Sequence, residues 1–407
     1  MRDNTKCFKF GSCFLADPDN RQLMSLLYNR AILHLDLDAF FVAVECLKND
    51  SLRGKPLIVG GTSDRGVVAA CSYEARRFGV HSAMPMKMAL RLCPDALVLR
   101  GDMDSYSRYS HLVTEIIADQ APVFEKASID EFYLDLTGMD RYFGCMQWSG
   151  ELRERIMKES GLPISFGLSV NKLVSKVGTG EVKPNGTIAV PSGTEKGFLA
   201  PLSTNKIPGI GKETYKKLSF MGVRTVKVLS EIPMGLLQRE FGKHGQELWR
   251  KANAIDDAAV VPYEEQKSMS SERTFQQDTL EVGKVRDLLR GMTERLAFDL
   301  RKANKLTSCV TVKIRYADFN TYTMQRRIAY TATDGPLQET ALDLFDRLYQ
   351  RRQLLRLIGI KFSGLVQGHY QIDLFNDTLE EIHLMQAMDR IRNRFGHQAV
   401  MRASGLG

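Results

Sequence analysis

The sequence has no hydrophobic run long enough to cross a membrane and no cluster of cysteines. Within its 407 residues, no stretch approaches the roughly 20 consecutive apolar residues that a membrane-spanning helix requires. The first 29 residues carry acidic side chains and no long apolar core, so they are not expected to form a secretion signal. The seven cysteines are scattered without CxxC spacing, which argues against both a zinc site and a disulfide framework. We therefore expect a cytoplasmic protein without membrane contacts.

The chain is long and basic. At 407 residues it exceeds what one hydrophobic core usually supports, so several domains are expected. Its net charge is +8, and residues 301–361 contain 12 Lys and Arg against 5 Asp and Glu, a surplus of seven positive charges. Such a segment is typical of a surface that neutralises phosphates, although an ordinary solvated basic face would look the same. The charge favours a nucleic-acid partner without proving one.

The periodicity of apolar residues divides the chain into regions with different predicted secondary structure. Between residues 30 and 189, apolar strands alternate with helical stretches, which indicates an α/β or α+β core. Short polar helices are predicted from about residue 190, and a polar linker over 263–271. Beyond the linker, strands at 309–316 and 357–365 and helices at 282–304 and 336–353 predict a separate α+β domain. The tail, 371–407, contains a short apolar motif followed by an amphipathic helix.

Carboxylates recur at two of the predicted strands. Asp36 and Asp38 end the first strand, and Asp130 and Glu131 lie on a later one. If the two strands are neighbours in a sheet, the carboxylates repel each other, and hard divalent cations bound through oxygen relieve that cost. Two such cations about 4 Å apart can stabilise an in-line displacement at phosphorus. Acids at strand ends are also often simply solvated, so this pattern by itself leaves both interpretations open.

Five motifs follow one another along the chain, and two of them contain these acids. They are HLDLDAFFVAVE at 34–45, AACSYEARRFGV at 69–80 followed by Met84-Pro85, SIDE with YLD at 128–135, GLSVNK at 167–172 and KPNG at 183–186. Together they resemble the motifs of the Y-family DNA polymerases, and bacterial DNA polymerase IV-like enzymes are the group they resemble most. The resemblance implies an α+β multidomain, right-hand polymerase. Its parts would be an extension (1–29), a palm (30–39 and 102–189), fingers (40–101), a helical thumb (190–262), the linker (263–271), an α+β little finger (272–370) and the tail (371–407).

The resemblance also implies roles for individual residues. Asp36, Asp130, Glu131 and the carbonyl of Leu37 would ligate two Mg²⁺ ions, for which Mn²⁺ is expected to substitute. Phe41 would be the steric gate, the aromatic ring that collides with a ribose 2′-hydroxyl. Tyr73, Arg76 and Lys183 would contact the incoming triphosphate. Asp38 is expected to support the site and Glu45 to be structural, and Ala39 stands where some relatives carry a larger aromatic residue.

Two segments suggest how duplex DNA would be held. The run from Ile207 to Lys212 resembles a helix-hairpin-helix, in which Gly209, Gly211 and Lys212 would approach a phosphate, although a plain helical turn is the alternative. Residues 241–245 are a weaker second copy. In the last domain, Lys313 and Arg315 alternate with apolar residues and would form a basic sheet face, with Arg326 and Arg327 on a paired strand.

The tail carries a possible clamp-binding peptide. Gln371, Leu374 and Phe375 resemble the short motif by which bacterial polymerases dock on the sliding clamp. A β-strand that completes the preceding domain is the alternative interpretation.

The combined prediction is a translesion DNA polymerase. It would transfer deoxynucleotides from dNTPs to a primer 3′-hydroxyl on a template, release pyrophosphate, work as a monomer and copy with low fidelity. No exonuclease segment is evident, so proofreading is not expected. A two-metal nuclease is a second hypothesis, but it gives no reason for Phe41, Tyr73 and Arg76. A non-catalytic DNA-binding scaffold is a third, and it predicts the loss of at least one acid.

Overall fold

The computed structural model describes residues 30–63, 65–139, 144–262, 265–368, 379–396 and 399–400. The chain forms two compact units, Met1–Tyr263 and Glu264–Gly407, which are treated separately below. Across these described ranges, no helix is long and apolar enough to span a bilayer. The predicted extension, 1–29, and the clamp-like motif at 371–375 lie outside the described residues.

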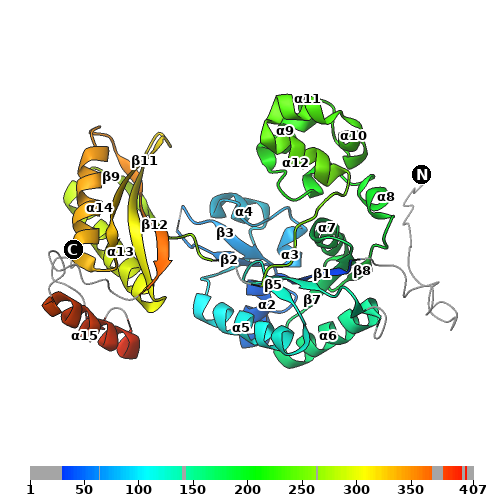
Figure 1. The fold of residues 1–407 in the computed structure, drawn as a ribbon, viewed down its shortest axis with the longest axis horizontal. Coiled ribbons are helices and arrows are strands. Elements are labelled where there is room, and N and C mark those ends of the chain that lie inside the picture. The colour runs from blue at the N-terminus through cyan, green and yellow to red at the C-terminus, as the bar shows by residue number, and fades with distance from the viewer. Residues whose placement is uncertain are drawn as a thin grey trace. The chain divides into compact units, whose positions relative to one another are not determined.

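The first unit is built on a five-stranded sheet with the order β5-β6-β1-β7-β8. Its strands are β1 (Ile32–Leu37), β5 (Phe124–Lys126), β6 (Glu131–Asp135), β7 (Ile164–Ser169) and β8 (Thr187–Ala189). The helices α2 (Phe40–Lys48), α5 (Met103–Gln120) and α6 (Cys145–Ser160) cover one face, and α7 (Lys172–Val182) covers the other (Figure 1). The central strand β1 is therefore buried along its whole length.

Alternation along β1 separates an apolar face from a polar one. Leu33, Leu35 and Leu37 point into the core with α5 and α6. His34 and Asp36 point to the opposite side, where Thr179 of α7 contacts His34. The sequence pattern of the first strand thus determines that the acid faces α7.

A smaller three-stranded sheet, β3-β2-β4, lies beside the first. Its elements are η1 (Asp50–Leu52), β2 (Leu57–Gly60), β3 (Val68–Cys71), α3 (Tyr73–Arg76), α4 (Met86–Leu92) and β4 (Leu97–Leu99). It has its own apolar core, which includes Ile58, Val80 and Met84.

The remainder of the first unit is helical, as predicted from its short polar segments. Its elements are α8 (Glu195–Leu199), η3 (Thr204–Lys206), α9 (Lys212–Phe220), α10 (Val226–Glu231), α11 (Met234–Phe241) and α12 (Lys243–Ala252). Their apolar side chains pack against Leu173, Val174 and Val177 of α7. Helices α11 and α12 approach closely at Gly245, where a Cβ atom would lie 2.0 Å from the carbonyl oxygen of Leu237.

The second unit is a four-stranded antiparallel sheet, β11-β10-β12-β9, with two helices on one face (Figure 1). Its elements are β9 (Ser268–Thr279), α13 (Val282–Lys302), β10 (Lys305–Tyr316), β11 (Thr321–Thr331), α14 (Asp334–Leu348) and β12 (Leu355–Gln367). Strand β9 begins at Ser268, so residues 268–271 belong to the sheet and not to the predicted linker. Their polar sequence misleads because β9 is an edge strand with one solvated face.

The helix α15 (Leu379–Phe395) packs on the second unit through buried ion pairs. Arg392 is fully buried and pairs with Glu294 of α13. Arg301 of the same helix pairs with Asp389 of α15 at 2.6 Å and with Asp334 of α14 at 2.7 Å. These ion pairs hold α13, α14 and α15 together.

Candidate active site

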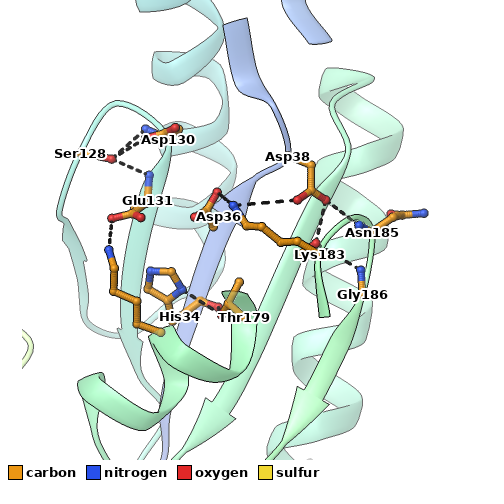
Figure 2. A network of polar contacts seen from close by, with 12 residues as sticks. His34, Asp36, Asp38, Ser128, Asp130, Glu131, Thr179, Lys183, Asn185 and Gly186 are labelled. Carbon is orange, nitrogen blue, oxygen red and sulfur yellow. Dashed lines mark hydrogen bonds and ion pairs between the residues drawn. The ribbon is translucent and has the colours of Figure 1, made fainter. Parts of the chain in front are cut away.

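Strand pairing brings the predicted acids together. Asp36 on β1 lies directly opposite Glu131 on β6, and the amide of Leu37 donates a 3.0 Å hydrogen bond to the carbonyl oxygen of Asp130. Asp130 lies in the turn before β6, where the hydroxyl of Ser128 donates to its carboxylate at 2.6 Å. The same hydroxyl accepts from the amides of Asp130 and Glu131 at 3.3 Å and 3.0 Å. Ser128 therefore shapes the turn that presents both acids (Figure 2).

Two lysines face these carboxylates. Lys183 forms an ion pair with Asp36 (Figure 2). Lys176 of α7 forms one with Glu131 at 2.5 Å. Burial raises the pKa of Asp36 to about 7, and the nearby charges of Glu131 and Asp130 add to that rise although Lys183 opposes it. The site thus concentrates negative charge where water is scarce, which favours a bound cation.

Asp36 borders two cavities. The larger, of about 350 Å³, is also lined by His34, Glu131 and Lys176, and by residues 205–210 of the helical region. The smaller, of about 150 Å³, is lined by Asp36, Leu37, Asp130, Phe41 and Arg76, among others, and Lys183 reaches both cavities. The carboxylate oxygens of Asp36, which borders both cavities, suit a hard divalent cation, because Mg²⁺ is held in proteins by one or two carboxylates.

Asp38 is more than a neighbour of the acids. Its buried carboxylate accepts hydrogen bonds from Ser165 and from the amide of Asn185, both at 2.7 Å, and from the hydroxyl of Tyr73 at 3.3 Å. The ammonium of Lys183 lies 4.0 Å away. Asp38 therefore ties the Tyr73 segment to the loop that carries Lys183, which is the supporting role that the sequence predicts.

The aromatic side chains around the smaller cavity are held in place by stacking. The ring of Phe41 stacks on Tyr106, with centroids 4.2 Å apart and planes 11° from parallel, and the hydroxyl of Tyr106 donates to Glu45 at 2.7 Å. This contact is consistent with the structural role predicted for Glu45. The Arg76 guanidinium lies 4.6 Å above the ring of Tyr73, and burial followed by the charge of Asp38 raises the pKa of Tyr73.

Ala39 has a left-handed backbone (φ 44°, ψ 44°) at the N-cap of α2, between Asp38 and Phe41. This conformation is uncommon for a residue with a Cβ atom. It turns the chain sharply from β1 into α2, and Asp36 of β1 and Phe41 of α2 line one cavity.

Three residues near the acids were not predicted from the sequence to belong to the site. They are His34, Lys176 and Ser128. His34 is 1% exposed and lies beside Asp36 and Glu131. Burial, followed by the charges of Lys176 and Lys183, holds the pKa of its imidazole well below the ordinary range. Its place two residues before Asp36 on a strand was a signal available from the sequence, because such residues share a face.

The predicted DNA contacts lie in two places. In the first unit, Gly209 (φ 95°) and Gly211 are exposed in the hairpin between η3 and α9, and Gly211 is the N-cap that precedes Lys212. The hairpin is braced by Lys251, whose ammonium donates to the carbonyl oxygen of Pro208 at 2.9 Å.

In the second unit, Lys313 and Arg315 lie on the sheet face opposite α13 and α14, as alternation predicts. Arg327 shares that face, and so does Lys361, which the sequence analysis did not select. Arg326 lies on the other face and pairs with Asp343 of α14. Successive strand residues point in opposite directions, so of the two arginines predicted on the paired strand only Arg327 lies on the basic face.

Comparison with known proteins identifies the family. Models of the impB/mucB/samB family, of its C-terminal domain and of a DNA polymerase-iota thumb domain match residues 35–180, 266–374 and 205–256. DNA polymerase IV of Dehalococcoides mccartyi is 37% identical over 375 residues, which cover 91% of this chain and 96% of that protein.

Among solved structures, the Y-family DNA polymerase chimera Dbh-Dpo4(243-245)-Dbh has a TM-score of 0.74 at 24% identity. An insertion ternary complex of Dbh DNA polymerase has a TM-score of 0.60 at 24% identity. Each match covers 83% of this chain and 100% of the other, and at this identity it shows a shared fold. The chain therefore belongs to the Y family of DNA-directed DNA polymerases and is close to DNA polymerase IV.

Proposed function

We propose that this protein performs two-metal nucleotidyl transfer from a dNTP to a primer 3′-hydroxyl, with Asp36, Asp130, Glu131 and the Leu37 carbonyl as metal ligands. The observation that carries the proposal is the place of Asp36, which lies opposite Glu131 in the sheet and borders both cavities. When bound, two Mg²⁺ ions would stabilise the attacking and the leaving oxygens of the displacement, and Mn²⁺ is expected to substitute for them. The ammonium groups of Lys183 and Lys176 already compensate the carboxylates that such ions would contact.

The chain's own side chains would bind and orient the nucleotide. Lys183 and Arg76 line the smaller cavity and supply positive charge for a triphosphate, while the Tyr73 hydroxyl is held beside them by Asp38. Phe41 lines the same cavity with its ring fixed by Tyr106, so a ribose 2′-hydroxyl would collide with an immobile surface. This arrangement favours deoxynucleotides.

Small side chains support the low fidelity included in the proposal. Ala69 and Ala70 of β3 line the smaller cavity, and both keep some exposure to solvent. Methyl groups leave room for a distorted base pair that a larger side chain would exclude. Small side chains at this wall suit the copying of damaged template.

Primer-template DNA would be held at the hairpin and at the basic sheet face, corresponding to a thumb and a little finger. Because Gly211 has no side chain to cap α9, the first amide groups of this helix can donate to a phosphate beside Lys212. Lys313, Arg315 and Arg327 would lie along the sugar-phosphate backbone and position the duplex without reading its sequence. Such binding should weaken steeply with salt.

The other predicted properties remain proposals. We propose the predicted boundaries of palm, fingers, thumb and little finger, with the little finger extended back to Ser268, where β9 begins. We propose that the protein acts as a monomer in the cytoplasm. Docking on a sliding clamp through Gln371, Leu374 and Phe375 is also retained, and it rests on the sequence motif alone.

Primer extension on an undamaged template with Mg²⁺ tests the proposal. Asp130→Ala should abolish incorporation, whereas Asp135→Asn, at the far end of the strand β6 that follows Asp130, should retain it. Both variants should bind primer-template DNA as the parent protein does. Incorporation by Asp130→Ala at the parental rate would overturn the metal assignment.

A further inference from the structure

The imidazole of His34 has a nitrogen with no partner beside the acids. His34 is 1% exposed, and its Nε2 atom is buried without a hydrogen-bond partner among the described residues. Its ring lies 4.7 Å from that of Tyr133, the residue opposite it in the sheet. In Figure 2 the second ring nitrogen points toward Thr179 and Nε2 points to the side of Glu131. The unpartnered atom is thus directed into the acidic site.

The contacts of Thr179 favour a proton on Nδ1 of His34. Nδ1 of His34 lies 2.9 Å from the Thr179 hydroxyl oxygen, and that hydroxyl lies 2.9 Å from the carbonyl oxygen of Ser175 and 3.2 Å from that of His34. A threonine hydroxyl in a helix commonly donates to the carbonyl oxygen four residues before it, and the 2.9 Å contact with Ser175 has this geometry. In that arrangement the Thr179 oxygen accepts from Nδ1–H, and the imidazole keeps a lone pair on Nε2.

The lone pair lies within reach of two carboxylates. One ligand atom each from His34, Asp36 and Glu131 fall within 4.8 Å of one another. Opposite ligands of an ion with bonds of about 2.1 Å are separated by about 4.2 Å, so a small adjustment would let one ion contact all three. His34 and Asp36 share a face of β1, and register places Glu131 beside them.

We propose that His34 Nε2 is a ligand of the cation held by Asp36 and Glu131, and that this nitrogen makes the position favour Mn²⁺ over Mg²⁺. The inference rests on the proposed function, because it requires a metal at these acids. Imidazole nitrogen is a good ligand for transition metals, whereas Mg²⁺ strongly prefers oxygen. Thr179 would orient the ring from the far side, as second-sphere hydrogen bonds to metal-bound histidines commonly do.

The test uses the full-length protein with Mn²⁺ alone, without DNA or nucleotide. Electron spin-echo envelope modulation should show coupling of Mn²⁺ to ¹⁴N in the unsubstituted protein. Labelling all histidines with ¹⁵N should replace the ¹⁴N coupling by a ¹⁵N coupling. This change distinguishes imidazole from the lysine nitrogens nearby. His34→Phe should remove it, and His111→Gln, at an exposed position on α5, should not. The measurement on the unsubstituted protein stands even if His34→Phe fails to fold.

Affinity gives a second readout. His34→Phe should weaken Mn²⁺ binding by about 10-fold or more and change Mg²⁺ binding less, and Thr179→Val should show a smaller loss for Mn²⁺. Loss of Mn²⁺ binding in Asp36→Ala, together with no histidine coupling in the unsubstituted protein, would overturn the inference and leave the proposed function intact. Undiminished Mn²⁺ binding by Asp36→Ala would overturn the metal assignment, and this inference with it.

Discussion

Replacing Asp38 by Asn should impair nucleotide binding without unfolding the protein. The carboxylate of Asp38 accepts from Ser165 and the amide of Asn185 at 2.7 Å and from the hydroxyl of Tyr73 at 3.3 Å, and Lys183 lies 4.0 Å away. An asparagine of the same shape keeps one oxygen acceptor but turns an NH₂ group toward the remaining donors. Both Tyr73 and Lys183 would therefore lose the group that positions them.

The size of the effect follows from these contacts. A hydrogen bond to a charged group contributes about 1.5–3 kcal/mol, and Asp38→Asn removes the charge from all of its bonds while keeping some of their geometry. If one such contribution is lost for the bound nucleotide, kcat/KM should fall by about 10- to 150-fold. Because Tyr73 and Lys183 would contact the triphosphate and not the primer hydroxyl, most of the loss should appear as a higher KM for dNTP.

Single-nucleotide incorporation measured over a range of dNTP concentrations separates kcat from KM. Tyr73→Phe removes only the longest of the three hydrogen bonds and should cost less, and the double variant should cost less than the sum of both because the two groups act together. Asp135→Asn controls for the loss of one negative charge on the same sheet. A fall in kcat with an unchanged KM, at unchanged thermal stability, would refute the positioning role.

Three further predictions concern other parts of the protein. Phe41→Ala should lower the discrimination against ribonucleotides by about 10- to 200-fold in competing incorporation assays, and Tyr106→Leu should lower it less, because it only loosens the ring that gates the sugar. Arg392→Met should reduce the free energy of unfolding by about 3–5 kcal/mol in urea titrations, since it leaves the carboxylate of Glu294 buried and unpaired; adding Glu294→Leu should recover most of it. Arg327→Ala should reduce by about 1 the slope of log affinity against log salt for primer-template DNA, measured by fluorescence anisotropy.

Each of these has a contradicting outcome. Unchanged sugar discrimination in Phe41→Ala would show that the Phe41 ring is not the steric gate. If the double variant of Arg392 and Glu294 is as unstable as Arg392→Met alone, packing and not charge holds α15 in place. Arg326→Ala is the matched control for the salt measurement, because its side chain faces α14 and pairs with Asp343; an equal effect of both arginines would refute the assignment of faces.

The sequence alone was sufficient for the fold class and for the family. Apolar and polar residues alternate so regularly in β10 that the exposure of Lys313 and Arg315 followed from strand geometry. The motifs around Asp36 and Asp130 identified the family, which the comparisons confirm. The local pattern was sufficient in these cases because the direction of a side chain in a strand depends only on its position along that strand.

Pairing between distant segments decided the rest. Alternation requires that Arg326 and Arg327 face opposite ways, but only the packing of α14 on the sheet brings Asp343 to Arg326. Likewise, Tyr106 fixes Phe41, and Thr179 orients His34, from helices far away in the chain. Such contacts depend on how sheets and helices pack, so the sequence by itself determined which groups are available for the chemistry, and the tertiary structure decided which of them meet.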